Sequence, residues 1–372
     1  FYSVCLMVKV QKIRINDDSQ DFWLVLGRDF LPVPQIDSYL RYLHSVGKSP
    51  NTIRSYAYHL KEFWLFLDCM HYEWDQVSLN EMSQFINFLK RGAVDNVVPL
   101  NQSQSKRTAK TINAIVTAVT SFYDYSARLS DATGPNVRKL VKGKKASYKS
   151  FLHHISKSEA STQNILKLKE PKRIPEILTA KQVKQLYMGC NSLRDKFLVL
   201  MLYETGMRIG ECLGLRHEDI KSWDKTIHVV PRGDNANAAR AKSHESRVID
   251  ISSDLIKLYT DYVVNEFDDV DSDYVFINIW GTDVGKPLAY STVYTKFKRL
   301  SKKLEIPFTP HIFRHTHATE LLRSGWDASY VQKRLGHKDI QTTINTYAHL
   351  NERDLKEAFN KFKQESTSAE QS

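Results

Sequence analysis

The spacing of apolar residues divides the chain into a helical first part and a mixed second part. Residues 8–15 and 22–26 are short runs of strand-favouring residues around a polar turn, which predicts a β-hairpin. From residue 35 to about 129, apolar residues recur at every third or fourth position, the period of an amphipathic helix. The first part is therefore predicted to be a hairpin followed by an all-helical domain.

Start and stop signals mark individual helices in this domain. Gly47 is a C-terminal cap for the first helix, and Ser49 and Pro50 occupy the N-cap and N1 positions of the second. Ser78 and Glu81 have the spacing of a capping box for the third. The fourth helix is predicted at 106–129.

After residue 175 the pattern becomes mixed. Thr179 begins a helix, and an apolar helix at 194–204 ends at Gly206. Two strand-like segments then flank a long polar hairpin. The segments predicted after residue 225 are strands at 226–230 and 247–252 and helices at 290–304, 309–323, 327–335, 339–348 and 351–365.

Positive charge is concentrated between the two parts. The 372 residues carry a formal net charge of +11 at pH 7, which alone is weak evidence for a nucleic-acid partner. Residues 131–175, however, contain eleven Lys and Arg against three acidic residues. Such a block suits a solvated linker and also suits a strap across phosphates. Its Lys142, Lys144 and Lys145 are candidate DNA contacts.

The fourth helix has three further cations in its N-terminal turn, Lys106, Arg107 and Lys110. The helix dipole disfavours positive charge there. Solvent exposure accounts for these residues, and a phosphate contact accounts for them as well. They are therefore candidate DNA contacts too.

Cysteine usage and hydropathy favour a cytoplasmic protein. Cys5, Cys69, Cys190 and Cys212 show neither CxxC pairing nor zinc-ligand spacing, so we expect reduced, buried thiols. The longest dense apolar run, at 197–203, is too short to span a bilayer. No membrane partner is expected.

Two segments contain arginines placed for an anion. In ETGMRIGECLGLR (204–216), Arg208 follows the break at Gly206 and presents a fixed charge with a fork suited to phosphate oxygens. In PHIFRHTHAT (310–319), His311 and Arg314 lie three residues apart in the first turn of a helix. Both therefore face one direction, and helix N-termini favour anions.

Two other segments add a lysine, a histidine and a phenol. In ARAKSHESRVIDIS (239–252), Lys242 lies in the polar hairpin, where its ammonium group can swing toward a leaving group. In RLGHKDIQTTINTYAHL (334–350), His337 follows a glycine at a helix end, and Tyr347 lies in a helix ten residues later. The phenol is a candidate nucleophile.

A metal site at His311, His315 and His317 is an alternative, because the first two are four residues apart on a helix. Arg314 lies between them and would repel a cation. No neighbouring Asp or Cys completes a ligand set. Phosphate is the favoured ligand of this helix.

In order and spacing, Arg208, Lys242, His311, Arg314, His337 and Tyr347 resemble the motif set of the tyrosine recombinase (phage integrase) family. The helical segments at 49–67 and 111–125 are similar to the core-binding domain of that family. The long hairpin and the N-terminal strands more loosely resemble the transposase A-type recombinases of site-specific transposons. The resemblance covers roughly residues 35–365.

The resemblance implies a multidomain fold with α and α+β parts. An all-helical, SAM-like core-binding domain would precede a mixed, mainly helical catalytic domain with a small antiparallel sheet. The expected divisions are an N-terminal hairpin or arm (1–34), the core-binding domain (35–130), the basic linker (131–175), the catalytic domain (176–350) and a C-terminal helix and tail (351–372), which packs within its own chain or on a neighbouring protomer.

It also implies DNA cleavage and rejoining without metal or ATP, since a 3′-phosphotyrosyl bond retains the energy of the broken phosphodiester. Tyr347 would be the nucleophile and Lys242 the general acid for the 5′-oxygen. Arg208 and Arg314 would hold non-bridging oxygens, His311 would accept or position a proton, and His337 would donate to a non-bridging oxygen. Glu211 would support Arg208.

The implied partners are double-stranded DNA with specific recombination sites, a homo-tetramer on two such sites, and accessory recombination proteins. The implied location is the bacterial cytoplasm, at the nucleoid. Two alternatives stay open at this point. They are DNA relaxation by a type IB topoisomerase, which uses a similar residue set, and a non-catalytic DNA-binding regulator.

Overall fold

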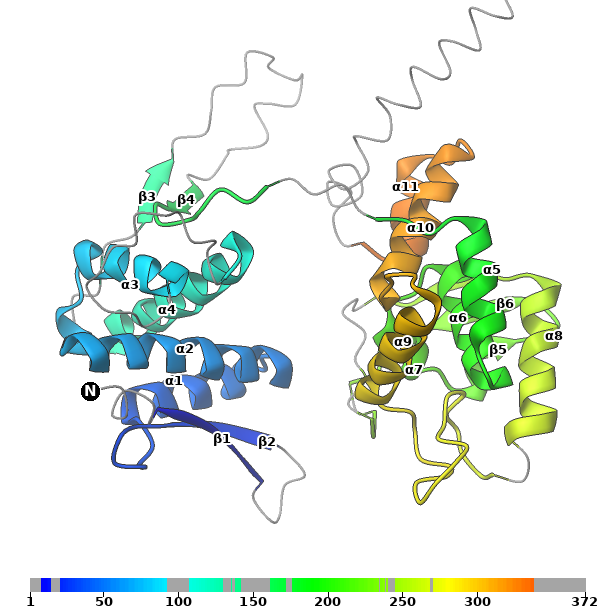
Figure 1. Ribbon diagram of the computed structural model, residues 1–372, viewed down its shortest axis with the longest axis horizontal. Coiled ribbons are helices and arrows are strands. Elements are labelled where there is room, and N and C mark those ends of the chain that lie inside the picture. The colour runs from blue at the N-terminus through cyan, green and yellow to red at the C-terminus, as the bar shows by residue number, and fades with distance from the viewer. Residues whose placement is uncertain are drawn as a thin grey trace, which may run out of the picture. The chain divides into compact units, whose positions relative to one another are not determined.

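The computed structural model divides the chain into two compact units. Unit 1 is Phe1–Lys172 and unit 2 is Arg173–Ser372 (Figure 1), and each has a hydrophobic core of its own. The structure describes residues 8–14, 21–91, 107–129, 135, 138–141, 161–171, 176–233, 235–237, 239, 245–267 and 270–337.

Unit 1 begins with the predicted hairpin. Strands β1 (Lys9–Arg14) and β2 (Asp21–Leu26) pair antiparallel. Val25 of β2 is buried in the same core as the helices that follow. Beyond the hairpin, the Arg28 guanidinium forms an ion pair with Asp68 at 3.1 Å. The hairpin is therefore a packed layer of unit 1.

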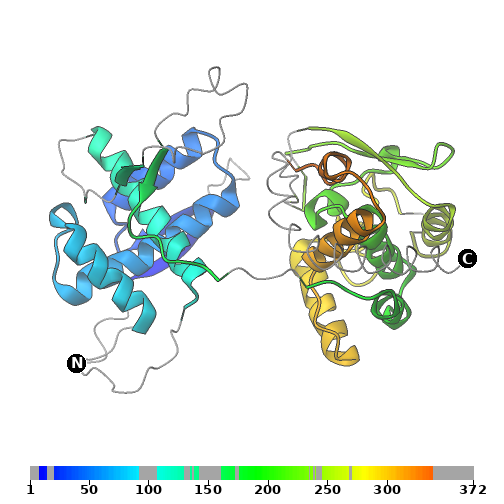
Figure 2. The same ribbon diagram turned by 90° about the horizontal axis from the view of Figure 1, so that it is seen from above.

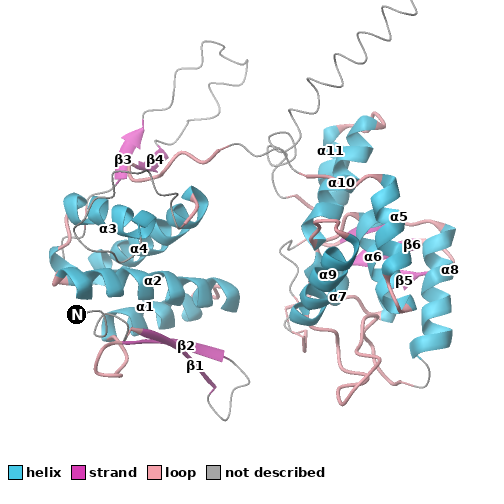
Figure 3. Cartoon of the chain, in the orientation of Figure 1, coloured by secondary structure: helices cyan, strands magenta, loops and turns pink. Residues whose placement is uncertain are grey.

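Along the described part of unit 1, four helices complete this core, as the apolar spacing predicts, and Figure 3 shows them in cyan. The Ser49 side chain accepts a hydrogen bond from the backbone N–H of Thr52, and Glu81 accepts one from the backbone N–H of Ser78 at 2.8 Å. Both predicted helix starts are confirmed. The helices are α1 (Pro34–Ser45), α2 (Pro50–Met70), α3 (Leu79–Arg91) and α4 (Ala109–Leu129), with a 3-10 turn at Trp74–Gln76.

Part of the basic segment belongs to unit 1. Strands β3 (Arg138–Val141) and β4 (Ser161–Asn164) pair antiparallel. Farther along, Asn113 of α4 donates to the Leu168 carbonyl at 2.9 Å and accepts from the Leu168 N–H at 2.8 Å. The last described part of the segment is thus bound to α4 by paired hydrogen bonds, which a free linker would lack.

The described part of unit 2 is mainly helical with one small sheet. Strands β5, β6 and β7 form an antiparallel sheet in that order, which confirms both predicted strands after residue 225. Its helices are α5 (Ala180–Gly189), α6 (Leu193–Thr205), α7 (Ile209–Leu213), α8 (Ser253–Tyr262), α9 (Tyr290–Leu304), α10 (Pro310–Arg323) and α11 (Ala328–Leu335), with a 3-10 turn at His217–Asp219 and a π-helical turn at Val263–Phe267. The strands are β5 (Ile220–Lys221), β6 (Thr226–Val229) and β7 (Arg247–Asp250).

Helix α6 is the centre of unit 2. Phe197, Val199 and Leu202, which point in different directions around the helix, are all buried. A helix buried on all sides reads as a continuous apolar run, which explains the sequence at 197–203. Helices α8 and α10 both contact α6, and the two views show α10 in orange beside α6 in green (Figures 1 and 2). The C-terminal end of α6 is therefore held in the interior.

The cysteine prediction is confirmed in part. Cys190 and Cys212 are free and buried, and burial raises the pKa of the Cys190 thiol to about 12. Cys69 is disulfide-bonded, so the prediction of a reduced thiol was wrong for this residue. Along the described part of the chain, no helix is long and apolar enough to cross a membrane.

Candidate active site

The turn between α6 and α7 positions Arg208. Gly206 ends α6 in the left-handed region with φ +62°, as predicted. A Cβ at this position would lie 2.6 Å from the His317 ring and 2.9 Å from the Leu335 side chain, so a larger residue would displace both neighbours. The chain then turns sharply, and Arg208 occupies the N-cap position of α7.

Glu211 holds Arg208 from inside the protein. Its Oε1 accepts from Arg208 Nη1 at 2.9 Å, and its Oε2 accepts from the Arg208 backbone N–H at 2.9 Å. Burial acts to raise the pKa of Glu211, but hydrogen bonds and charges from Arg247 and Arg208 outweigh burial and hold that pKa below its ordinary value. Glu211 is thus a buried carboxylate that orients Arg208.

Arg314 enters the same region from α10. The helix begins after Thr309 with Pro310 in its first turn, as predicted. The Arg314 side chain is buried, and its Nη1 donates to the Gly206 carbonyl at 2.9 Å. Its Nη2 donates to the Leu335 carbonyl at 2.7 Å. Arg314 therefore links the turn after α6 to the end of α11.

The two arginines converge at the C-terminal end of α11. Arg314 binds the Leu335 carbonyl, and Arg208 Nη2 donates to the next carbonyl along, that of Gly336, at 3.2 Å. Two guanidinium groups on adjacent carbonyls must lie within one small region. The partial negative charge at a helix C-terminus offsets their mutual repulsion. A phosphate placed there would meet two forked cations.

His337 lies beside this pair. Its backbone N–H donates to the Gln332 carbonyl at 3.1 Å, and Gln332 Nε2 donates to the His337 carbonyl at 3.0 Å. Burial, followed by the charges of Arg314 and Arg208, lowers the pKa of His337 to about 4. The imidazole is neutral at pH 7, and a neutral imidazole retains one N–H donor.

Two histidines of α10, His311 and His317, have different surroundings. His311 is exposed, whereas Arg314 is buried, so one helical turn separates a surface group from an interior one. His317 is buried and its Nε2 accepts from Arg334 Nε at 3.1 Å. Burial and the Arg334 charge lower the pKa of His317 to about 3. Among the residues that the structure describes, no group of three His, Cys, Asp or Glu could hold a metal ion.

Several predicted residues lie outside the described residues. They include the candidate general acid Lys242 and the candidate nucleophile Tyr347. The predicted helices at 339–348 and 351–365 lie there as well. Four candidate DNA contacts are also outside the described residues, namely Lys106, Lys142, Lys144 and Lys145.

The other two candidate DNA contacts are on α4 or just before it. Arg107 Nη2 forms an ion pair with Glu62 of α2 at 2.6 Å, with both side chains partly buried. Lys110 is exposed. The Glu62 partner gives Arg107 a structural reason for its place in the sequence, in addition to any phosphate contact.

Sequence reasoning missed two arginines at the site. Arg247, the first residue of β7, binds Glu211, and Arg334 of α11 donates to His317 and to the Asp250 carbonyl at 3.0 Å. For both arginines, the position next to a recognised motif could have indicated a role at the site. Arg247 follows Lys242 by five residues at a strand start, and Arg334 directly precedes the Leu-Gly-His motif.

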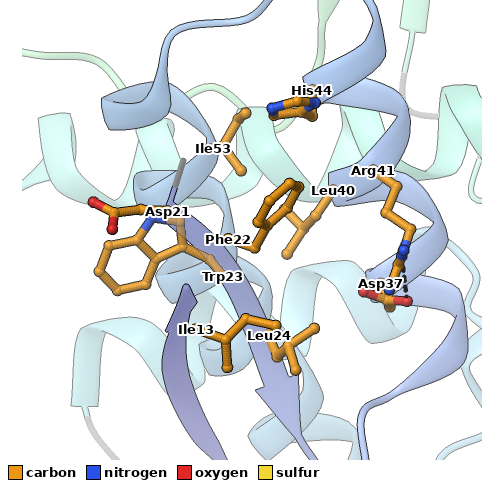
Figure 4. Close-up of a pocket in the computed structure, with 10 residues that line it drawn as sticks. All are labelled: Ile13, Asp21, Phe22, Trp23, Leu24, Asp37, Leu40, Arg41, His44 and Ile53. Atoms are coloured by element: carbon orange, nitrogen blue, oxygen red, sulfur yellow. Dashed lines mark hydrogen bonds and ion pairs between the residues drawn. The ribbon is translucent and has the colours of Figure 1, made fainter. Parts of the chain in front are cut away.

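The structure also has a small pocket in unit 1, of about 30 Å³. It lies between the hairpin and the first two helices, and Figure 4 shows the apolar side chains of its lining with an ion pair between Arg41 and Asp37 at one side. The lining is mostly apolar and includes Phe22, Trp23 and Leu40. A pocket of this size and composition suits packing better than a substrate.

The fold and the converging arginines are those expected of a tyrosine-type site-specific recombinase. The model of the phage integrase family matches residues 176–354, and that of the phage integrase N-terminal SAM-like domain matches residues 36–129. Together with a relative that is 40% identical over 95% of the chain, these matches show that the chain belongs to the phage integrase family. The predicted family, fold class and enzyme class are confirmed.

Among relatives, the chain is similar to transposase A from transposon Tn554 of Staphylococcus aureus, with 40% identity over 356 residues that cover 95% of this chain and 98% of that protein. Tyrosine recombinase XerA of Pyrococcus horikoshii is 26% identical over 88% of this chain and 93% of its own length.

Two solved structures have a similar fold. A Tn1549 transposon integrase in complex with transposon right end DNA aligns with a TM-score of 0.59 and 17% identity over 88% of this chain and 99% of that one. XerH site-specific recombinase bound to palindromic difH substrate aligns with a TM-score of 0.58 and 17% identity over 89% and 84%.

Proposed function

We propose that this recombinase moves a transposon by cutting and rejoining double-stranded DNA at specific sites. The observation that carries the proposal is the convergence of Arg208 and Arg314 on adjacent carbonyls beside His337. The 40% identity to a transposase along almost the whole chain supports the transposon as its element.

In the proposed reaction the phenolic oxygen of Tyr347 attacks a backbone phosphorus and the bond from phosphorus to the 5′-oxygen breaks. The phenol gives its proton to His311 or to solvent, and Lys242 gives a proton to the departing 5′-oxygen. The products are a 3′-phosphotyrosyl ester and a 5′-hydroxyl. A hydroxyl of another strand then reverses the attack, so the number of phosphodiester bonds is unchanged.

Four described residues of the candidate site assist this reaction. Arg208 and Arg314 bind the non-bridging oxygens as their charge grows, and such a preorganised donor is worth roughly 10²–10³ in rate. His337 donates from a neutral imidazole to a non-bridging oxygen. His311, at the surface of α10, accepts or positions a proton near the phosphate.

Binding and assembly extend the proposal. Lys106, Arg107, Lys110, Lys142, Lys144 and Lys145 are proposed to contact DNA phosphates. Two sites are proposed to be joined by four copies of the chain, the C-terminal segment 351–372 of each packing on a neighbour, with accessory recombination proteins. The Tn1549 integrase structure is a complex with transposon right end DNA, and the XerH structure is bound to a palindromic difH substrate; the first of these supports the DNA partner. The proposed location is the bacterial cytoplasm, at the nucleoid.

The test begins with the DNA. Sequencing the junctions between the element and its host DNA gives the two ends, and a duplex of one end is made with a nick close to the cleavage position. A nick lets the freed strand diffuse away and traps the covalent product. We expect a protein–DNA adduct that survives denaturation, and none with Tyr347→Phe.

Two results would count against the proposal. An adduct of equal yield with Tyr347→Phe would exclude this nucleophile. Relaxation of supercoiled plasmid with no recombinant product from paired ends would instead indicate the topoisomerase alternative.

A further inference from the structure

Arg247 contacts two parts of the site at once. Its Nη2 donates to Glu211 Oε2 at 2.6 Å and its Nη1 lies 3.4 Å from Oε1, a forked pairing. Its Nε donates to the Arg334 carbonyl at 2.8 Å. The side chain is 10% exposed and that of Glu211 is fully buried. A lysine has the charge of Arg247 but not its planar fork.

Arg247 extends the pattern of carbonyl contacts at the end of α11. The carbonyls of Arg334, Leu335 and Gly336 accept, in order, from Arg247, Arg314 and Arg208. The last turn of α11 is therefore held by three cations from β7, α10 and the start of α7. The next residue is His337, and Tyr347 follows ten residues later.

Glu211 connects Arg247 to the charge of Arg208. One carboxylate between two guanidinium groups leaves a net charge of +1 on the three side chains. Without Arg247, the same buried carboxylate would face Arg208 alone and the net charge would fall to zero. The attraction of Arg208 for a phosphate would weaken accordingly.

Gly336 fits this arrangement closely. It ends α11 in the left-handed region with φ +66°, and a Cβ there would lie 2.8 Å from Arg247 Nη1. The guanidinium of Arg247 thus lies directly against the backbone that leads to His337. Loss of this side chain would leave space beside a turn on which the position of His337 depends.

We propose that Arg247 is a positioning residue for strand cleavage. It shares Glu211 with Arg208, so that the carboxylate does not neutralise Arg208 alone, and it fixes the turn before His337 through the Arg334 carbonyl. This inference rests on the proposed function, because it assigns Arg247 a part in the cleavage step. A purely structural ion pair would affect stability alone, so the two roles can be separated.

The chain offers a matched control in the same unit. Arg194, at the opposite end of α6 from Gly206, is 1% exposed, forms an ion pair with Asp195 and donates to the Ile277 carbonyl at 2.9 Å. It therefore has the same kinds of partner as Arg247, a carboxylate and a backbone carbonyl. Arg194→Met should lower stability as Arg247→Met does, with a cleavage rate within about threefold of wild type.

The experiment measures single-turnover adduct formation on the nicked end duplex, DNA affinity by gel shift, and the urea midpoint, for Arg247→Met, Arg247→Lys, Glu211→Gln, Arg247→Met/Glu211→Gln and Arg194→Met. For Arg247→Met we expect adduct formation to slow by roughly 10–100-fold, less than for a direct donor, with DNA affinity within about threefold. Arg247→Lys, which has the charge without the fork, should lie between wild type and Arg247→Met.

The double variant separates the effect of Arg247 on the net charge from the effect of its hydrogen bond to the Arg334 carbonyl. Removing Glu211 and Arg247 together restores a net charge of +1 through Arg208, so the double variant should form adduct at least about threefold faster than Arg247→Met. A double variant as slow as Arg247→Met would overturn the charge argument. An Arg247→Met rate within threefold of wild type, or an equal loss in Arg194→Met, would overturn the whole inference.

The wild type separates this inference from the proposed function. If wild-type protein forms no adduct on the end duplex, the proposed cleavage reaction fails and the role of Arg247 fails with it. If wild type forms adduct and Arg247→Met forms it equally fast, only the role of Arg247 fails.

Discussion

Arg208 and Arg314 donate hydrogen bonds to neighbouring carbonyls, those of Gly336 and Leu335. The contact brings together arginines from the start of α7 and from α10, and it depends on the left-handed glycines that end α6 and α11. The site is therefore built on helix ends, where backbone carbonyls lack helical partners and can accept from side chains.

The buried position of Arg314 leads to a prediction for Arg314→Lys. Lysine retains the charge but cannot reach the Gly206 and Leu335 carbonyls with one planar group. We expect adduct formation to fall by roughly 10²–10³ and the free energy of unfolding to fall by about 1–3 kcal/mol, since a buried acceptor loses its donor. Single-turnover kinetics and urea titration measure the two effects. A variant with wild-type kinetics would contradict the assignment.

Gly206 gives a prediction about packing. Gly206→Ala places a methyl group 2.6 Å from the His317 ring in a left-handed residue, whereas Gly325→Ala, with φ +83°, places one in open space. Backbone strain alone costs about 1 kcal/mol, and overpacking adds about 1–3 kcal/mol. Both variants bear the strain and only Gly206→Ala bears the overpacking, so urea unfolding should show Gly206→Ala to be less stable than Gly325→Ala by about 1–3 kcal/mol. Equal losses would mean that α10 moves away without cost.

His317 predicts a pH dependence of stability. Its pKa is about 3 in the folded protein and 6.5 ordinarily, so between these values the unfolded chain binds a proton that the folded chain does not. The stabilisation is complete above pH 6.5 and is lost as the pH falls toward 3. Urea midpoints at pH 7, 5.5 and 4.5 should fall more steeply for wild type than for His317→Gln. Parallel slopes would exclude His317 as the source.

The lowered pKa of His337 predicts how the cleavage rate depends on pH. Because its pKa is lowered to about 4, this imidazole should stay neutral between pH 5.5 and 8. His337→Gln, which also has a neutral N–H donor, should retain more of the cleavage rate than His337→Ala, by a factor that is constant across this range. A factor that grows below pH 6.5 would indicate that the protonated imidazole is the active form.

The partners of the cations near α4 predict different DNA behaviour. Lys110 is exposed and Arg107 is paired with Glu62. Lys110→Gln should reduce the slope of log affinity against log salt by about 0.9, the value for one phosphate contact. Arg107→Gln should change the slope less and lower the urea midpoint of unit 1 more. A larger change in slope for Arg107→Gln than for Lys110→Gln would indicate that Arg107, not Lys110, contacts a phosphate.

The local features of the fold could be predicted from the sequence because neighbouring residues determine them. The caps at Ser49 and Thr179 and the stop at Gly206 follow from adjacent side chains and appear as predicted. The pairing of Arg247 with Glu211 could not be predicted, because it joins residues 36 apart in the sequence that meet only in the folded unit.

The candidate site shows the same division. Arg208, Arg314 and His337 were found by motif and do converge, but helical spacing alone placed His311 and Arg314 on one face, and the structure has one exposed and the other buried. Spacing gives the direction of a side chain, but not how deeply the rest of the protein covers it. The disulfide at Cys69 was missed because no CxxC pairing marks it.

The central claim is that Tyr347 becomes bonded to DNA in the presence of the two arginines. Its most direct measurement is mass spectrometry of peptides from the trapped adduct, together with end analysis of the cut strand. The account predicts one modified peptide, with the nucleotide on Tyr347 through a 3′-phosphate and a free 5′-hydroxyl on the released strand. DNA on any other residue, or a 5′-phosphate linkage, would contradict it.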